Sequence, residues 1–526
     1  MINKKPLFAT LAFLLIIAVL AMPALSAGEQ SIKLLAVTQE NGSLEGSVAD
    51  LTLNLKKGSG GVFIRSNPLT KLDTQISTRL AKDEACRISS RNCAEYDFFY
   101  TIQSDSPIVG GPSAGAAISS LTFAVLENLD INENVAISGT INAGGLIGPV
   151  AGLKEKISAA KENNIQTVLI PQATHMVPGG NDTIDLFSYG RNIGVQVKEV
   201  STLTEAVQEF TGRVYDKEYG NFTVDPEYGN IMKTLATKQC NRSENIYEQL
   251  LASKNYSEIN ETVVELEQQA INRTNLGKKT FRKGEYYSAA SYCYSSNVML
   301  RRLLLKIQRP GKEQLNKILD KNKQDLAQLS EKLETRKYES LGQLETFMIV
   351  QERLTDARHY LDTTEKLLSE TNISRKEVIF NLASGIERIY SARTWEIFYN
   401  ISGEKITVNE DGVKQSCQDK ITEAQERYAY TKMFLPGALG SVERELKFAR
   451  QDYKSDDYEL CLFKASKAKA EVDVLMLALG LNNNTIKNVI DQKLKIVRNT
   501  ISEQTERGRF PIIGYSYYQY AQSLKD

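Results

Sequence analysis

A period-two pattern of apolar and polar residues marks the first stretch able to build a core. Leu51, Leu53 and Leu55 alternate with polar residues, as in a strand with one buried face. This pattern predicts strands within residues 31–55. The glycine-rich sequence KKGSGG at 56–61 predicts a hairpin turn into a returning strand.

Strand and helix patterns then interleave up to about residue 210. In chain order, the spacing of apolar residues and the turn signals predict a helix beginning at Pro68, a strand at 96–102, a loop at 104–111, a helix at 114–129, a strand at 135–138, a helix at 152–161, a strand at 167–170 and a helix at 202–210. Interleaved strands and helices are typical of an α/β (α+β) domain, which we place at 28–212.

Beyond about residue 215 the pattern becomes mostly helical. Residues 213–230, with Pro226 and Gly229, are predicted to be a linker. Residues 231–526 are predicted to form an α-helical domain of helical hairpins. One helix face carries a leucine series, in which Asn322 fills one position: Leu315, Leu319, Leu326, Leu329 and Leu333.

The chain has an even number of cysteines, which in an exported protein favours disulfides: Cys86, Cys93, Cys240, Cys293, Cys417 and Cys461. The first two flank a short loop. The other four suggest an internal duplication, because KQC and KQSC each begin a helical stretch that reaches one more cysteine after a second helix. This echo predicts the pairs Cys240–Cys293 and Cys417–Cys461, with other pairings left open. No cysteine belongs to a C-x-x-C motif, so no zinc site is expected.

The N-terminus has the layout of an export signal. Lys4 and Lys5 precede an apolar run at 7–20, and small residues follow at 22–27. Residues 1–27 are therefore predicted to be a signal peptide or an N-terminal membrane anchor. Either outcome would make the protein extracellular or place it on the cell surface.

Charge and glycosylation signals fit that location. Lys+Arg and Asp+Glu both total 64, so nothing in the charge balance favours nucleic acid as a partner. Asn-x-Ser/Thr sequons predict a glycoprotein, although an Asn-rich chain also produces sequons by chance. They begin at Asn41, Asn181, Asn221, Asn241, Asn255, Asn260, Asn272, Asn372, Asn400 and Asn483.

Two segments carry candidate chemistry. Ser113 lies in GGPSAG at the start of a helical run, and Lys154 lies in GLKEK at the start of another. A serine hydroxyl needs a base to become nucleophilic, and lysine can serve only as the neutral amine. Apolar neighbours of Lys154 favour that form by desolvation. Lys156, two residues further on, is expected to point away and to be solvated.

The serine also precedes a helix, where backbone N–H groups can bind a developing oxyanion. Pro112 has no N–H to donate, so the donors are expected from Gly111, Ser113 or Ala114. Asp105 and Glu155 are acidic neighbours for which surface roles are expected.

The segments GGPSAG, SGTINAGGLIGPVAGLKEK and TVLIP together resemble the proteolytic domain of the Lon protease family over about residues 31–210. The family carries GPSAG at its nucleophile, TGE where this chain has Ser138-Gly139-Thr140, and GGLKEK around its catalytic lysine. The resemblance implies that Ser113 is the nucleophile and Lys154 the general base of a Ser-Lys dyad. It also implies that Ser138 helps to orient the lysine.

The chain departs from the family in several places. Val109-Gly110 replaces the frequent Lys-Asp before GPSAG, and Thr140 replaces the glutamate of TGE. No G-x-x-x-x-G-K-[ST] phosphate-binding loop occurs in the sequence, so no cofactor is expected. The expectation is an ATP-independent serine endopeptidase that acts on peptides, unfolded protein or exposed loops outside the cytoplasm.

Two alternatives remain open. G-x-S-x-G also fits a Ser-His-Asp hydrolase, but residues 105–107 are expected to interrupt the required strand, and the chain has only His175 and His359. The motif also fits a role in packing alone, in a catalytically inactive Lon-like fold used as an envelope binding or scaffold protein. The helical domain shows no chemistry of its own, and its expected partners are substrate, another envelope protein or further copies of the chain.

Overall fold

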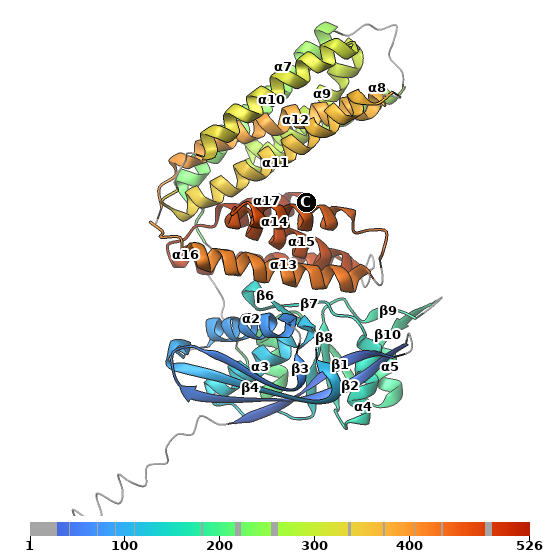
Figure 1. Cartoon of the computed structure of the whole chain (residues 1–526), viewed down its shortest axis with the longest axis vertical. Helices are drawn as coiled ribbons and strands as arrows, with labels where there is room; N and C mark the ends of the chain where they lie inside the picture. Colours follow the sequence, from blue (N-terminus) through green and yellow to red (C-terminus); the bar gives the residue numbers. More distant parts are fainter. Residues whose placement is uncertain are drawn as a thin grey trace, which may run out of the picture. The chain divides into compact units, whose positions relative to one another are not determined.

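The computed structural model describes residues 29–40, 43–70, 72–89, 91–109, 111–179, 182–215, 222–253, 261–334, 338–371, 374–403, 405–432, 435–478 and 486–525 (Figure 1). Within these ranges no helix is both long and apolar enough to cross a membrane. The predicted signal or anchor at 1–27 lies outside them, as do all sequon asparagines except Asn241, Asn272 and Asn400, which are exposed.

The chain forms two compact units. The first comprises 1–216 with 426–438 and 471–486, and the second comprises 217–425, 439–470 and 487–526. The first unit contains the mixed α/β region and the second is mostly helical. The α/β class followed by a helical region, as predicted from the sequence, is therefore confirmed.

The first unit alternates strands and helices. Its strands are β1 (Gln30–Glu40), β2 (Ser43–Lys57), β3 (Val62–Thr70), β4 (Tyr96–Val109), β5 (Val135–Ile137), β6 (Thr140–Asn142), β7 (Leu146–Gly148), β8 (Thr167–Pro171), β9 (Met176–Pro178), β10 (Thr183–Asp185) and β11 (Gln196–Val200). Its helices are α2 (Leu72–Ile88), α3 (Gly115–Glu127), α4 (Leu153–Glu162), α5 (Leu186–Ile193) and α6 (Leu203–Thr211), with 3₁₀ turns η1 (Cys93–Glu95), η2 (Pro112–Ala114) and η3 (Ala143–Gly145).

Seven strands form one mixed sheet in the order β11-β8-β5-β1-β2-β4-β3. The predicted hairpin at 56–61 is wrong, because β4 lies between β2 and β3, antiparallel to the first and parallel to the second. The glycine-rich connection instead wraps the start of β4. The Asp97 carboxylate accepts hydrogen bonds from the N–H groups of Ser59 (2.9 Å) and Gly61 (2.8 Å), which lower the pKa of Asp97.

Two further expectations near this edge are corrected. Pro68 does not begin a helix but lies in β3, an edge strand whose register shifts between Asn67 and Leu69. An edge strand tolerates proline because one side of it makes no ladder bonds. The predicted loop at 104–111 is also mostly strand, since β4 continues to Val109 and pairs there with Thr70.

Helices cover both faces of the sheet. Leu34 of β1 packs in a core with α3 and α6, whereas its neighbour Leu35 packs in a second core with α4 and α5. Successive residues of a strand point to opposite faces, so one strand serves both cores. The helix α4 lies close against β2 at Gly46, where a Cβ atom would be 2.9 Å from the Ala159 Cβ.

The remaining helices are α7 (Pro226–Ser253), α8 (Glu261–Arg282), α9 (Tyr286–Gln308), α10 (Lys312–Glu334), α11 (Leu341–Ser369), α12 (Arg375–Trp395), α13 (Glu410–Lys432), α14 (Gly440–Lys454), α15 (Tyr458–Ala478), α16 (Ile486–Glu506) and α17 (Ile512–Lys525), with η5 (Glu396–Asn400). The predicted linker 213–230 overlaps α7. Pro226 opens that helix because Asp225 accepts hydrogen bonds from the N–H groups of Glu227 and Tyr228.

The predicted disulfide pairing is confirmed in the structure, which joins Cys86–Cys93, Cys240–Cys293 and Cys417–Cys461. The last two link α7 to α9 and α13 to α15, with α8 or α14 between the linked helices. The five leucines predicted to share one face of α10 are all buried. The common origin of the two disulfide-linked helical segments stays a prediction.

A buried carboxylate joins α11 to the last helix. Glu345 is 9% exposed and accepts a hydrogen bond of 2.9 Å from the N–H of Ile512, the first residue of α17. Burial raises the pKa of Glu345 from 4.5 to about 7, although the backbone N–H groups act in the opposite direction. The protonated form therefore stabilises the folded state. This contribution is complete below pH 4.5 and is lost as the pH rises through about 7.

Glu345→Gln is expected to remove this pH dependence. Trp395, the only tryptophan, is buried in the same core as Ile512, so its fluorescence reports unfolding of the helical unit in urea. Between pH 5 and 8 the free energy of unfolding should fall for the wild type. This fall should exceed that of the variant by about 1–3 kcal/mol. Glu331→Gln, at an exposed position on α10, is the control and should follow the wild type. Parallel pH curves for Glu345→Gln and wild type would contradict this account.

Candidate active site

Ser113 lies in the short turn η2, between the end of β4 and the start of α3. Gly111 enters the turn with φ of 106°, a conformation that residues with a side chain rarely adopt. Gly115 then begins α3 at a position where a Cβ atom would lie 2.9 Å from the backbone nitrogen of Ile141. The glycines of GGPSAG therefore allow both the turn and the close approach of α3 to β6.

Two backbone hydrogen bonds join the serine turn to the segment after β5. The Gly139 N–H donates to the Ser113 carbonyl at 3.0 Å, and the Ala116 N–H donates to the Gly139 carbonyl at 3.0 Å. Ser138, the residue before Gly139, is fully buried and donates its own N–H to the Leu169 carbonyl in β8. The position of Ser113 is thus fixed relative to Ser138 through the main chain.

Lys156 reaches Ser138 from α4. Its side chain is 1% exposed, and its Nζ donates to the Ser138 Oγ at 3.0 Å. Burial lowers the pKa of the Lys156 amine from 10.5 to about 7, against a smaller opposing contribution from Glu155. The expectation that Lys156 is solvated is therefore wrong. Close to neutral pH this amine can exist in the uncharged form that a general base requires.

Lys154 lies elsewhere. Its side chain is partly exposed, and its Nζ is 5.8 Å from the centre of the Tyr189 ring. The Tyr189 hydroxyl bonds in turn to Ser158, one turn further along α4. Because residues two apart on a helix point in different directions, only one of the two lysines can face Ser138.

The sequence contained a signal that distinguishes the two lysines. Leu153, Ile157 and Ala160 form the buried face of α4, and Lys156 lies three residues after the first of them. It therefore falls on the apolar face at helical spacing, whereas Lys154 does not. The apolar neighbours along the chain, on which the choice of Lys154 rested, do not report the direction in which a helical side chain points.

Other predicted site residues are placed as follows. The roles of Gly111 and Ala114 as oxyanion donors remain predictions, and the side chain of Asp105 lies outside the described residues. Thr140, at the position of the family's glutamate, is 2% exposed and its hydroxyl has no hydrogen-bond partner among the described residues.

Each histidine contacts residues outside the serine turn. The Nδ1 of His175 is 2.7 Å from the Glu199 carboxylate, and its ring stacks on Phe187 at a centroid distance of 4.7 Å. His359 belongs to α11 in the helical unit. The strand β4 does run almost to the serine, contrary to the predicted interruption at 105–107. A histidine–carboxylate pair also occurs in a Ser-His-Asp triad, but among the described residues neither histidine is hydrogen-bonded to Ser113, so the structure does not favour such a hydrolase.

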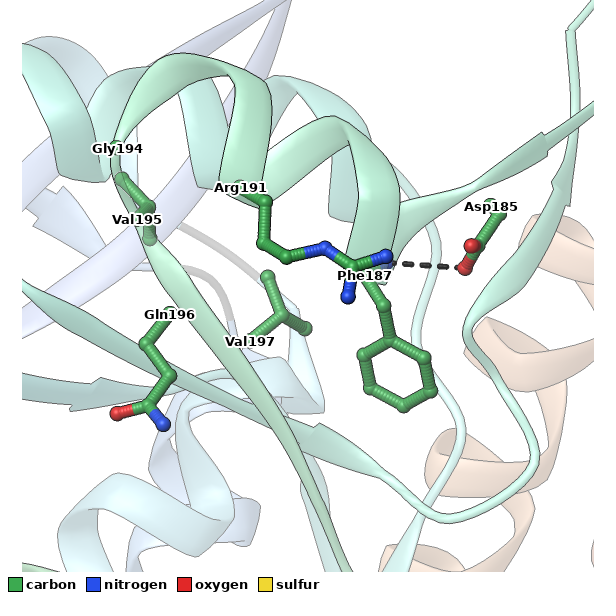
Figure 2. A pocket seen from close by; sticks show the side chains of 7 residues that line it. All are labelled: Asp185, Phe187, Arg191, Gly194, Val195, Gln196 and Val197. Atoms are coloured by element: carbon green, nitrogen blue, oxygen red, sulfur yellow. Dashed lines mark hydrogen bonds between the residues drawn. The ribbon is translucent and has the colours of Figure 1, made fainter.

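A cavity of about 610 Å³ lies on the same unit, beside α5 and the edge strand β11. Figure 2 shows its lining, in which Phe187 and Val197 provide apolar surface and Arg191 extends toward Asp185. None of the predicted catalytic residues lines it, so this cavity gives no evidence on the chemistry of Ser113.

The segment that contains these residues is similar to a known protein family. Residues 81–185 match the family model of the Lon protease (S16) C-terminal proteolytic domain. This segment contains the serine turn, Ser138 and both lysines of α4. The chain therefore carries a Lon-family proteolytic domain, and the match supports serine peptidase activity in that domain.

Three Lon proteases illustrate the extent of the similarity. The chain is 49% identical to Lon protease of Buchnera aphidicola over 61 residues, which is 12% of the chain and 8% of that relative. It is 28% identical to Lon protease of Clostridium beijerinckii over 159 residues, 30% of the chain and 19% of the relative. It is 36% identical to Lon protease 2 of Bacillus subtilis over 78 residues, which is 15% of the chain and 14% of that relative. The chain thus covers less than a fifth of each of these relatives.

The buried amine has a consequence for stability. Above about pH 7 the native Lys156 amine lacks a proton that the unfolded chain keeps up to about pH 10.5. The free energy of unfolding should therefore rise across this window by about 1.4 kcal/mol per pH unit from this group. Lys156→Met removes the titrating amine, so its stability relative to wild type should be greatest near pH 6 and diminish toward pH 10.

This stability difference can be measured by pulsed hydrogen exchange of β8 peptides after equilibration in urea at each pH, which reports on the α/β unit alone. Lys154→Met is the matched control, because that side chain is partly exposed, and its curve should run parallel to that of wild type. A constant gap between Lys156→Met and wild type from pH 6 to 10 would show that the amine is not held neutral in the folded state.

Proposed function

We propose that the protein is a serine endopeptidase in which Ser113 is the nucleophile and Lys156, in place of Lys154, is the general base. The observation that carries the proposal is the buried Lys156 amine bonded to Ser138, whose neighbour Gly139 is hydrogen-bonded to the Ser113 carbonyl. A neutral amine accepts the hydroxyl proton of Ser113 as its oxygen attacks a substrate carbonyl. Ser138 orients the amine by accepting one of its hydrogens.

The start of α3 supplies the remaining chemistry of the proposed site. Backbone N–H groups of Gly111, Ser113 or Ala114 stabilise the negative charge that develops on the substrate oxygen. The lysine ammonium formed in the first step then returns its proton to the leaving amine. A water molecule, activated by the same amine, hydrolyses the acyl-enzyme.

We further propose that the protein works without ATP and outside the cytoplasm. The sequence contains no P-loop, so the reaction draws on no nucleotide site in this chain. The apolar N-terminal segment and the three disulfides favour an oxidising compartment. The proposed substrates are unfolded proteins or exposed segments, which can enter a site without prior mechanical unfolding.

The test is cleavage of an unstructured protein such as reduced casein, without ATP, by residues 28–526 and three variants. Ser113→Ala and Lys156→Met are expected to lower kcat/KM by at least about a thousandfold, because the nucleophile and its base act as one unit. Lys154→Met is expected to stay within about threefold of wild type, since that amine makes no contact with Ser138. Equal cleavage by wild type and Ser113→Ala would refute the proposal and would favour the inactive scaffold instead.

The pH profile gives an independent measurement. Because the base is active when deprotonated, log kcat/KM should rise with unit slope below about pH 7 and level off above it. A profile that levels off only near pH 10 would show that the base is an ordinary solvated lysine. Lys154→Met should leave the midpoint unchanged, which separates the two lysines by a property other than rate.

A further inference from the structure

Arg87, in the last turn of α2, lies beside the proposed site but has no part in the reaction described above. The helix α2 packs against the serine turn η2, against β6 and against the glycine turn η3. It therefore contacts both the serine turn and the β6–β7 hairpin that follows Ser138. Arg87 lies at the end of α2 that is closest to the glycine turn.

The guanidinium group of Arg87 is held on one side and contacts the turn on the other. Its Nε donates to the Glu84 carboxylate at 2.9 Å, and Glu84 is only 7% exposed. Its Nη2 lies 3.3 Å from the position that a Cβ atom on Gly145 would occupy. The group thus packs directly over Gly145, in the space that a side chain there would need.

The glycine turn lacks side chains of its own and is contacted by several neighbouring elements, of which α2 is one. Gly144 and Gly145 have φ angles of 81° and 73°, and neither has a side chain that could anchor it. Glycine has more conformational freedom than any other residue, so contacts from neighbouring elements matter for this link. Besides Arg87, these contacts are Leu203, whose Cβ is 3.5 Å from the position of a Cβ atom on Gly145, and the bridge between Leu146 and Thr202. This link belongs to the β6–β7 hairpin, which connects Ser138 to the helix of Lys156.

The end of α2 is itself firmly attached. The Cys86–Cys93 disulfide joins it to η1, immediately before β4. The Ser89 hydroxyl donates to the Glu127 carboxylate at the end of α3 at 2.6 Å, and the buried Ser119 hydroxyl donates to the Ala81 carbonyl at 3.0 Å. These contacts attach the end of α2, and with it Arg87, to α3, the helix that follows Ser113.

We propose that Arg87 is a positioning residue for the proteolytic site. From α2 it fixes the Gly144–Gly145 turn, and through the β6–β7 hairpin it keeps the Ser138 hydroxyl and the Lys156 amine in register with Ser113. This inference rests on the proposed function. Without Arg87 the turn samples other conformations, and the hydrogen-bonded arrangement of the amine exists for a smaller fraction of the time. The loss falls on kcat, because Arg87 touches neither substrate nor reacting atoms.

The experiment compares Arg87→Met with Arg79→Met, an exposed arginine on the same helix. Two assays are used. The first gives kcat and KM for reduced casein, and the second gives the rate at which a fluorophosphonate labels Ser113. The second reports activation of the serine without peptide binding. Arg87→Met is expected to lower both kcat and the labelling rate about tenfold with KM within about twofold, whereas Arg79→Met matches wild type. Arg87→Lys is expected to recover part of the loss, because it restores the cation beside Glu84 but not the planar group over Gly145.

Removing Arg87 alone leaves the Glu84 carboxylate buried and unpaired, which could unfold the unit. Glu84→Gln/Arg87→Met avoids this, and circular dichroism verifies folding. The inference is overturned if the folded double variant keeps the wild-type kcat and labelling rate. If only Arg87→Lys folds, the same outcome for that variant overturns it. A lowered melting temperature with unchanged labelling would show a purely structural role, and would overturn it too. Ser113→Ala is assayed first, and undiminished cleavage by that variant would refute the proposed function and with it the role of Arg87.

Discussion

The burial of one amine is the constraint on which the α/β unit depends. An ammonium group as enclosed as Lys156 would lose its hydration, so burial lowers the pKa of this amine to about 7, and the amine donates a hydrogen bond to Ser138. Such burial requires a closely packed surrounding, which the cores on both faces of the sheet provide. The helix α4 approaches Gly46 of β2 closely on one face, and α3 approaches β6 closely at Gly115. The packing of the α/β unit and the proposed role of Lys156 as a base therefore both depend on the burial of this amine.

Much of the fold could be predicted because its signals are local. Leu51, Leu53 and Leu55 are buried in β2 as their alternation indicated, and α3 and α4 lie where their spacing placed them. The pairing of strands was not local information. The turn sequence at 56–61 has hairpin composition, but the strand beside β2 on that side is β4, which pairs from Lys57 with Tyr96 to Ala49 with Ser104. Sequence periodicity reports which face of a strand is buried and carries no information on which strand lies beside it.

The candidate site was predicted only in part, because some of its signals are local in the sequence and others depend on the folded structure. Its serine could be recognised because glycines on both sides of Ser113 meet steric needs that the structure shows at Gly111 and Gly115. The choice between two lysines depended on the angle around the helix axis. The buried face formed by Leu153, Ile157 and Ala160 includes Lys156. The helical spacing of these residues in the sequence is enough to identify Lys156 as the buried lysine. The contact of Arg87 with Gly145 joins residues 58 positions apart and had no sequence signal.

The disulfides of the helical region also affect what happens when the backbone is cut. Cys240–Cys293 encloses all of α8, and Cys417–Cys461 encloses all of α14. A single break in either enclosed segment leaves the two pieces covalently joined, so the flanking helices stay together and their packing survives. Under the proposed function the protein is itself a protease, and these disulfides make it tolerant of nicks at these places. Fragments produced there would separate only after reduction.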